Sequence, residues 1–300
     1  MSTLPVVAAV DGSDDSWRAL DWALDAARRR GAPLRVAHVR QYDAWAHPGA
    51  PVVLPPPPDE DPVLAEARAR LAGTAEGTEV EYAGLDGAPG ALLPELGAEA
   101  DLLVLGSRGR GGFARLLLGS NGLTAARDAE CPVVIVPRPG REVDGPPPRP
   151  GPRVVVGLKV DGPDDATLDL AFTEAALRDA RLEVVAAYPW PLQTWAAPGE
   201  LLPPPVDQQA VEHETRTLAE GFLAAHRERH PEVPAEPRPV PGDAAGHLVA
   251  ASLEADLVVV GRHRRRLLAP ARMLGSVTHA VLLHAASPVA VVPPAPAEDH

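Results

Sequence analysis

The sequence predicts an α/β fold of two tandem doubly wound domains, each with a mostly parallel five-stranded sheet flanked by helices. Three observations lead to this prediction. Short apolar runs such as Val6–Val10 alternate with longer segments of helical period, which is the pattern of parallel sheets. The second half of the chain repeats the first. In the first half a buried apolar run ends in a glycine-rich turn, at the edge where open parallel sheets bind ligands.

Local signals predict the elements of the first half in order. The first helix is expected to begin after Asp14-Asp15-Ser16, residue types that cap helices well, and to end at Gly31. A second helix is expected from Pro62 through Leu71, and a short third helix from Gly90 to Ala98. The apolar face of the first helix consists of Leu20, Ala23, Leu24 and Ala27. Strands are expected at Val6–Val10, Leu34–Val39, Glu79–Ala83, Leu102–Leu105 and Val133–Val136.

The duplication needs no gap over the first two strands and first helix of each half. Residues 6–39 lie over residues 154–187 at a constant offset of 148, which pairs Leu20 with Leu168. The repeat resumes later, where Gly106 pairs with Gly261. A period near half of the 300 residues fits two domains of ordinary size. The predicted domains are residues 1–137 and 153–294, joined by a proline-rich linker at 138–152.

The amino-acid composition limits the kinds of partner that this protein is expected to bind. The formal net charge of −13 argues against binding to a nucleic-acid backbone, which requires a basic surface. No apolar run approaches the length of a membrane span, and no signal-peptide core precedes the first strand, so we expect a cytoplasmic location without membrane contact. Cys131 is the single cysteine, which excludes an intrachain disulfide, and its place before a buried strand favours a packed thiol.

A widely spaced glycine motif follows the fourth predicted strand. It reads Gly106-x2-Gly109-x9-Gly119-Ser120 and leads into a helix. Glycines allow a close backbone approach to a ligand, and the amides that open a helix can receive an anion, so the motif predicts a phosphate site. A P-loop is excluded because no lysine follows Gly119, and a dinucleotide fingerprint would lie after the first strand instead. The alternative without a ligand is a glycine-rich surface turn.

This motif, with an aspartate closing the first strand, resembles the ATP-binding subgroup of the universal stress protein family, and the resemblance covers nearly all the chain as two copies. It implies a Rossmann-like fold of the adenine nucleotide alpha hydrolase type. It also implies that Ala9, Asp11 and Val39 contact the adenosine part of ATP. Gly106 and Gly109 would lie beside the ribose and phosphates, and the family's phosphate-tail positions fall on Gly119, Ser120 and Asn121, although Asn121 departs from the usual valine or threonine. Arg108, Arg110 and Arg115 are candidates for charge neutralisation.

The second half departs from the motif at three places. Lys159 stands where Asp11 does, Arg264 replaces the second glycine, and Gly275 arrives one residue late. A side chain at position 264 would obstruct backbone approach, and the extra residue would shift the helix start. We expect a weakened site, made of Gly261, Gly275, Ser276 and Val277. The basic run 262–266 has two alternative roles, a side-chain phosphate clamp or a contact with the other half.

Other chemistry-bearing residues favour structural roles. His38 points away from the neighbouring Val39 if strand alternation holds, and His247 lies on a predicted helix without a second histidine at metal-ligand spacing. We therefore expect no metal held by protein ligands, and Mg²⁺ only as a companion of the ATP phosphates. Trp17 and Trp22 are expected to pack rather than to stack on a ligand.

The resemblance implies an ATP-binding stress-response regulator with little or no turnover, and we expect no catalytic residues. Two alternatives stay open, a slow ATPase of the same superfamily and an interaction scaffold with an empty glycine turn. The chain lacks the Ser-Gly-Gly-x-Asp-Ser and His-Ile-Gly-His motifs of the superfamily's enzymes. Family members commonly pair through their last strands, so residues 133–136 are expected to meet residues 289–292 within one chain. A homodimer of whole chains would add to that pairing.

Overall fold

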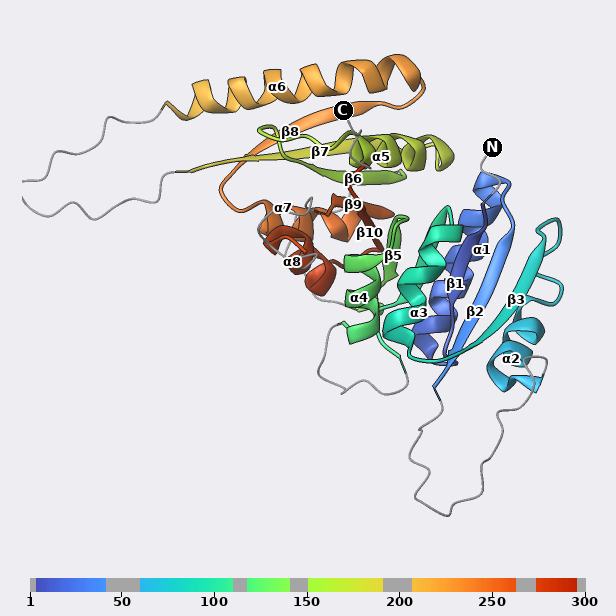
Figure 1. The fold of residues 1–300 in the computed structure, drawn as a ribbon. Coiled ribbons are helices and arrows are strands. Elements are labelled where there is room, and N and C mark those ends of the chain that lie inside the picture. Colours follow the sequence, from blue (N-terminus) through green and yellow to red (C-terminus); the bar gives the residue numbers. More distant parts are fainter. Residues whose placement is uncertain are drawn as a thin grey trace, which may run out of the picture.

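The protein is described by a computed structural model of the 300-residue chain. It describes residues 4–41, 60–109, 118–140, 151–190, 207–262 and 274–295. The predicted linker at 138–152 therefore lies largely outside the described residues. Strands and helices alternate through both halves, as the apolar runs predicted (Figure 1).

The first half contains five strands and four α-helices in its described part. The elements are β1 (Val6–Ala9), α1 (Asp14–Arg30), β2 (Leu34–Arg40), α2 (Pro62–Leu71), β3 (Val80–Asp86), α3 (Pro89–Leu96), β4 (Leu102–Gly106), α4 (Ser120–Asp128) and β5 (Val133–Val136). A 3₁₀ turn, Gly97–Glu99, follows α3 and carries the chain to β4.

The second half repeats this order. Its elements are β6 (Arg153–Leu158), α5 (Asp165–Leu177), β7 (Arg181–Tyr188), α6 (Gln208–Arg229), β8 (Ala235–Pro241), α7 (Ala244–Ala251), β9 (Leu257–Gly261), α8 (Ser276–His284) and β10 (Val289–Val292). A 3₁₀ turn, Ser252–Glu254, again precedes the fourth strand of the half.

All ten strands form one sheet. Their order is β3-β2-β1-β4-β5-β10-β9-β6-β7-β8, and every neighbouring pair is parallel except the central one. At the centre β5 and β10 run antiparallel, with Val133 opposite Val291 and Ile135 opposite Val289. This confirms the predicted pairing of the two last strands within the chain. Because the sheet twists along its length, the strands of the second half run across those of the first in Figure 1.

Helices cover both faces of the sheet, and each face has a core that continues through both halves. Side chains alternate across a strand, so Val6 and Ala8 of β1 pack with α1 and α2, while Val7 packs with α4 on the other face. The same two cores extend to α5 and α6 on the first face and to α7 and α8 on the second (Figure 1). The first helix contributes Leu20, Ala23, Leu24 and Ala27 to its core, as predicted.

Helix α1 begins earlier than the sequence signals suggested. It starts at Asp14, and the side chain of Ser13 accepts a hydrogen bond from the amide of Ser16 at the N-terminus. Asp14 and Asp15 lie inside the first turn, where acidic residues are favoured by the helix dipole. Gly31 ends the helix in the left-handed conformation (φ 60°), as predicted.

Other bounds differ as well: β1 ends one residue before its predicted end, β2 and β4 each extend one residue further, and the third helix and third strand differ more. The third helix starts at Pro89 and ends at Leu96, because the last residues of the predicted Gly90–Ala98 helix tighten into the 3₁₀ turn. The third strand runs over Val80–Asp86 rather than Glu79–Ala83, since its pairing with β2 continues to Arg40. The second helix has its predicted bounds, and Asp61 accepts hydrogen bonds from the amides of its first turn.

The sheet ends at β8, an edge strand that carries three prolines. Pro237, Pro239 and Pro241 occupy alternate positions, so the missing amide hydrogens all lie on one side of the strand. The other side pairs with β7. Proline at these positions therefore leaves no amide to template the addition of another strand.

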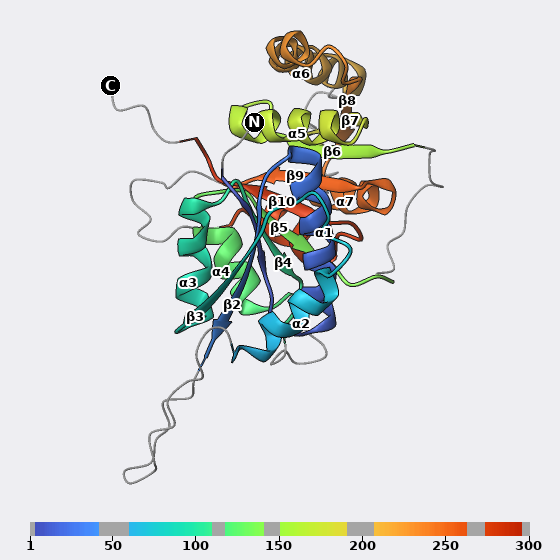
Figure 2. The same cartoon turned by 90° about the vertical axis from the view of Figure 1, so that its right-hand side faces the viewer.

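Buried ion pairs join the two halves beside the central strands. Glu174 of α5 is buried and accepts hydrogen bonds from Arg30 of α1 and from Arg178. Arg30 also pairs with Asp101 at 3.1 Å, and Arg29 donates to the carbonyl of Leu177 at 3.3 Å. Figure 2 shows the last turn of α1 reaching the second half at this point. One carboxylate thus holds guanidinium groups from both halves.

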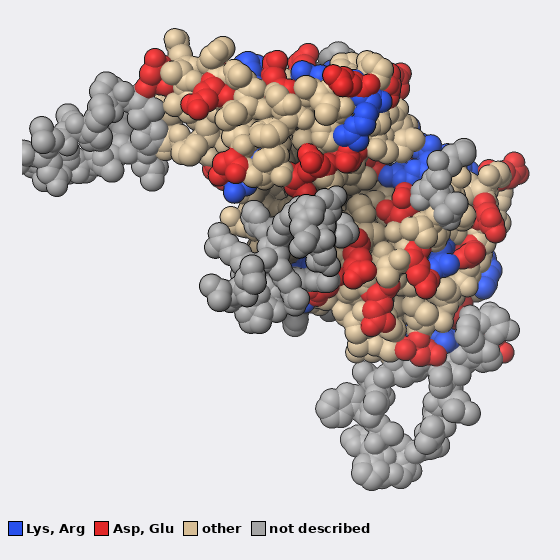
Figure 3. All heavy atoms as spheres, turned by 45° about the horizontal axis from the view of Figure 1, so that its top comes forward, with Lys and Arg blue, Asp and Glu red and all other residues tan. Residues whose placement is uncertain are grey.

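On the face drawn in Figure 3, acidic side chains are spread over both halves, and basic side chains are scattered among the acidic ones. The excess of acidic side chains agrees with the net charge of −13. In the described part of the chain, no helix is long and apolar enough to cross a membrane.

Candidate functional site

The predicted site residues come from three adjacent strands. β2, β1 and β4 are neighbours and run parallel, so their carboxyl ends meet at one edge of the sheet. Ala9 ends β1, Gly106 ends β4, and Val39 is the last residue but one of β2. Ala9 and Val39 are partly buried against the same core, on the α3 and α4 face. They form an apolar wall on that side of the edge.

Asp11 and Gly109 lie against each other at this edge, although they are far apart in sequence. A Cβ atom on Gly109 would stand 2.3 Å from Asp11 Oδ2, so no other residue fits there without moving the aspartate. Asp11 Oδ1 accepts hydrogen bonds from the amide and hydroxyl of Ser13, at 3.0 and 2.6 Å. The structure therefore brings the predicted acidic residue and the second glycine of the motif together.

Gly106 has a different structural reason to be glycine. A Cβ atom on it would stand 2.5 Å from the backbone carbonyl of Asp15, so its small size lets β4 pack against the start of α1. The turn continues through Ser107, whose amide donates to the carbonyl of Val136 and whose carbonyl accepts from the amide of Gly119, at 2.9 and 2.8 Å. These bonds place the turn directly beside the start of α4.

The start of α4 presents amides without a side-chain cap. Gly119 is its N-cap residue, and no side chain makes a capping hydrogen bond there. Ser120 and Asn121 are exposed. A Cβ on Gly119 would meet only ordinary contacts, at 3.7 Å from Ser107 O and 3.8 Å from Arg108 Cα. The helix is nine residues long, so its dipole and first amides favour an anion at this point.

Asp15 is a central residue of this region that sequence reasoning treated only as a helix-capping type. It is fully buried and accepts a hydrogen bond from Ser107 Oγ at 2.9 Å. Arg138 Nε lies 2.7 Å from Asp15 Oδ1, Arg108 Nε lies 4.0 Å from Oδ2, and Arg18 pairs with it as well. Three guanidinium groups surround one carboxylate behind the glycine turn. Two adjacent aspartates at a helix start were the only sequence signal.

The ionisation of Asp15 should make stability depend on acidic pH. Burial alone would raise the pKa of Asp15, but hydrogen bonds from Arg138 and Ser107 and the charges of Arg138 and Arg18 hold the pKa below its ordinary 3.8. The unfolded chain therefore takes up this proton at a higher pH than the folded chain. The contribution of ionised Asp15 is present above the unfolded pKa and is lost as the pH falls through the folded one.

We expect the free energy of unfolding, measured with urea at about pH 6 and about pH 3, to fall less on acidification in Asp15→Asn than in the native chain. At the higher pH the variant should be the less stable of the two, because three guanidinium groups lose their carboxylate. An equal acid-induced loss in both proteins would contradict this role for Asp15.

Several predicted residues fall outside the described part. Arg110 and Arg115 belong to the segment 110–117, so their candidate role is not placed. Arg108 is placed, and its guanidinium is mostly buried beside Asp15. Ser13 Oγ lies 3.4 Å from the carbonyl of Arg108, which links this residue to the Asp11 turn.

The second half differs at the matching edge. Lys159 is exposed and pairs with Asp161 at 3.4 Å. A Cβ on Gly261 would stand 2.7 Å from Thr167 Oγ1, so this glycine packs against α5 as Gly106 packs against α1. Gly275 is the N-cap residue of α8, Ser276 is exposed, and Val277 packs partly into the core. Arg264 lies outside the described residues.

Arg262 makes a contact between the halves. It directly follows Gly261, and its guanidinium donates to the carbonyls of Ala126 and Arg127 at the end of α4. A cation at this end of a helix is favoured by the dipole. Of the two alternative roles for the basic run, this first residue makes the contact with the other half; positions 263–266 are not described.

The residues expected to be structural lie inside the fold. His38 Nδ1 is 2.7 Å from Asp61 Oδ2, and Trp17 is buried in the core. Cys131 is buried, and burial raises the pKa of its thiol to about 12, so the thiol stays protonated at neutral pH. Within the described ranges, no group of three histidine, cysteine or acidic side chains could hold a metal ion.

The universal stress protein family model matches residues 3–137 and 152–293. The Mycobacterium tuberculosis universal stress protein Rv2005c is 34% identical over 296 residues, covering 95% of this chain and 96% of that protein. A universal stress protein structure from Archaeoglobus fulgidus has a TM-score of 0.58 at 18% identity and covers 97% of this chain and 96% of its own. A universal stress protein solved in complex with cAMP is 36% identical, covers 45% of this chain and 98% of its own, and has a TM-score of 0.35.

The family model thus covers both halves, and the mycobacterial relative aligns along nearly the whole length of both chains. The chain belongs to the universal stress protein family, as a member with two tandem domains.

Proposed function

We propose that the first half binds ATP at the carboxyl ends of β1, β2 and β4, and that the chain acts as a nucleotide-dependent regulator with little or no turnover. One observation supports this most strongly. Gly109 lies so close to Asp11 that any side chain there would displace the carboxylate, and the same turn is hydrogen-bonded to the uncapped start of α4. The carboxylate of Asp11, the backbone of Gly109 and the uncapped amides at the start of α4 therefore lie around one point at this edge of the sheet.

The groups at this edge of the sheet match the adenine, ribose and phosphates of ATP. The apolar wall of Ala9 and Val39 would take the adenine, and the carboxylate of Asp11 would accept a hydrogen bond from the ribose. The amides that begin α4, with the hydroxyl of Ser120, would take the phosphates. The guanidinium groups around Asp15 lie behind the turn and would favour the negative charge. Mg²⁺, when present, would be held by the phosphates with few protein ligands.

The second half lacks two of these features. The acidic position is Lys159, already paired with Asp161, and the sequence has Arg264 where the first half has Gly109. We therefore propose that ATP binds more tightly to the first half than to the second.

We expect calorimetric titration of the full chain with ATP to give one tight site, or two sites of well-separated affinity. Gly119→Val should weaken the tight site strongly, because the new side chain would enter the space between the turn and the helix start, where a Cβ atom meets only ordinary contacts. Gly275→Val, at the matching position, is the control and should leave that site intact. Two equivalent sites, or wild-type affinity in Gly119→Val, would contradict the assignment, and cAMP serves as the comparison nucleotide without a phosphate tail.

We also expect ATP turnover to be far below the roughly 10 s⁻¹ of a typical enzyme. Among the described residues, Ser120 makes no hydrogen bond to a base that could activate it, and phosphate contacts alone suffice to bias the turn and α4 toward one arrangement. Phosphate release should be measured under multiple turnover. Release of several phosphates per second, abolished in folded Asp11→Ala and Gly119→Val, would instead make the chain an ATPase, and no saturable ATP binding would favour a scaffold.

A further inference from the structure

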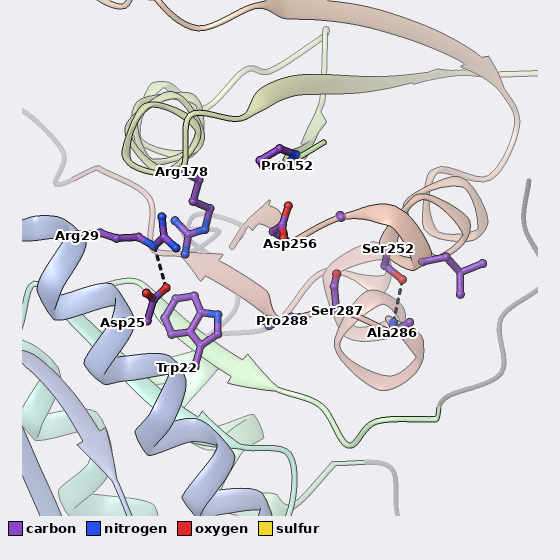
Figure 4. Close-up of a pocket in the computed structure, with 12 residues that line it drawn as sticks. Trp22, Asp25, Arg29, Pro152, Arg178, Ser252, Asp256, Ala286, Ser287 and Pro288 are labelled. Carbon is purple, nitrogen blue, oxygen red and sulfur yellow. Dashed lines mark hydrogen bonds and ion pairs between the residues drawn. The ribbon is translucent and has the colours of Figure 1, made fainter. Parts of the chain in front are cut away.

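A cavity of about 530 Å³ lies between the two halves and shares no lining residue with the glycine turn (Figure 4). Trp22, Asp25 and Arg29 of α1 form one side of it. The other side comes from the second half: the end of α5, the 3₁₀ turn before β9, and the segments that lead into β6, β9 and β10. Its volume is typical of small-molecule sites, and junctions between domains commonly hold such sites.

Comparison of the two sequence repeats shows how the residues at this cavity differ from the matching residues of the first half. Arg178 and Asp256 occupy the positions that Arg30 and Asp101 occupy in the first half. There Arg30 and Asp101 form a closed pair at 3.1 Å. In the second half, Arg178 pairs with Glu174 and Asp256 accepts from the amide of Arg153 at 2.7 Å. Both side chains line the cavity, so opposite charges face it where the first half has an ion pair.

Ser287 supplies a hydroxyl group that the fold does not use. It is 6% exposed, and its Oγ is buried without a hydrogen-bond partner among the described residues. Ser252 in the same wall is satisfied, since it donates to Val249 O and accepts from the amide of Ala286. The first half has Cys131 and Gly97 at these two positions, where a Cβ atom on Gly97 would stand 3.2 Å from Cys131 Sγ. The Oγ atom has almost no surface open to the cavity, so this hydroxyl marks a difference between the halves and does not contact a ligand there.

The charges of the lining are balanced but separated. Figure 4 shows the guanidinium groups of Arg29 and Arg178 together near Asp25 and Trp22, with Asp256 and Ser287 across from them. Asp25 pairs with Arg29 at 2.7 Å, and Arg178 lies 5.5 Å from the centre of the Trp22 ring. The lining contains two arginines and two aspartates, so a ligand of no net charge with opposite charges at its two ends fits best.

We propose that this cavity binds a small zwitterion, an amino acid or a dipeptide. Its carboxylate pairs with the guanidinium groups of Arg178 and Arg29, and its ammonium group with Asp256. An apolar side chain lies along Trp22 and Leu253, a large exposed apolar residue of the lining. This inference does not depend on ATP binding in the first half.

The test is calorimetry on the full chain with L-phenylalanine and L-phenylalanylglycine as zwitterions. N-acetyl-L-phenylalanine, which lacks the ammonium group, and L-phenylalaninamide, which lacks the carboxylate, are the matched analogues. At least one zwitterion should bind saturably, and each analogue should bind about tenfold more weakly or worse. Absence of saturable binding by both zwitterions, or equal binding of phenylalanine and its two analogues, overturns the proposal.

Variants locate the site within the chain. Asp256→Asn, which can still accept from the amide of Arg153, should reduce the affinity about tenfold without lowering the thermal midpoint much. Asp101→Asn, at the matching position of the first half, is the control and should keep the native affinity. Native affinity in Asp256→Asn overturns the proposed site. The analogue series gives its answer even if a variant fails to fold.

Discussion

Glu174→Ala is expected to lower the free energy of unfolding by about 3–5 kcal/mol, because it leaves two buried guanidinium groups without their shared carboxylate. The side chains of Arg30 and Arg178 are each 7% exposed, and that of Glu174 is 1% exposed. Arg30 retains Asp101, but Arg178 loses its ion pair. Urea unfolding followed by tryptophan fluorescence and by circular dichroism should show the loss.

A matched control for this variant is available on α6. Glu212 and Arg216 have the same spacing as Glu174 and Arg178, but both side chains are more than 40% exposed. Glu212→Ala should change the free energy of unfolding by only about 0.3–0.5 kcal/mol. Similar losses in both variants would show that burial between the halves adds nothing to the Glu174 pairs.

Gly109→Val is expected to weaken ATP binding by about a hundredfold or more, since several charged hydrogen bonds to the phosphates depend on backbone approach at this turn. The Cβ atom would also stand 2.3 Å from Asp11 Oδ2 and would displace the carboxylate. Calorimetry on the folded variant measures the loss. Native affinity would remove the glycine turn from the proposed site.

A double variant separates the two effects of the new side chain. Asp11→Ala alone should reduce ATP affinity about tenfold, through loss of one hydrogen bond. Gly109→Val combined with Asp11→Ala should bind as poorly as Gly109→Val alone, if the glycine allows close approach of the phosphates. Recovery of the double variant to the affinity of Asp11→Ala would show that position 109 acts only by displacing the carboxylate.

Much of the fold could be predicted because its signals are local. Apolar runs identified the strands of the first half, and Pro62 and Gly31 marked helix bounds that the structure confirms. The errors have different causes. The third strand extends to Asp86 because β2, some 46 positions earlier in the chain, offers it partners up to Arg40. The start of α1 is a local error, because Ser13 caps the amide of Ser16 only three residues away and could have been chosen as the cap from the sequence.

The candidate site was predictable as a set of residues but not as a set of contacts. The motif placed Asp11 and Gly109 at one edge of the sheet, yet their direct contact depends on the folded path of the turn. Asp15 could not be singled out, since its importance comes from Arg138, which arrives from beyond the fifth strand. The contact of Arg262 with α4 joins residues more than a hundred positions apart and has no periodic signal. The residues assigned to ATP remain predictions.

The antiparallel junction of β5 and β10 also has a consequence for how the two copies change over time. In a complex of identical subunits, every substitution appears on both sides at once, and a mutation that harms either role is removed. Here the partner is carried on the same polypeptide in a fixed one-to-one ratio, so each copy can change alone. The two copies already differ in this way, since the second has Lys159 and Arg262 where the first has Asp11 and Ser107. Covalent pairing of this kind permits a division of labour that a symmetric assembly would forbid.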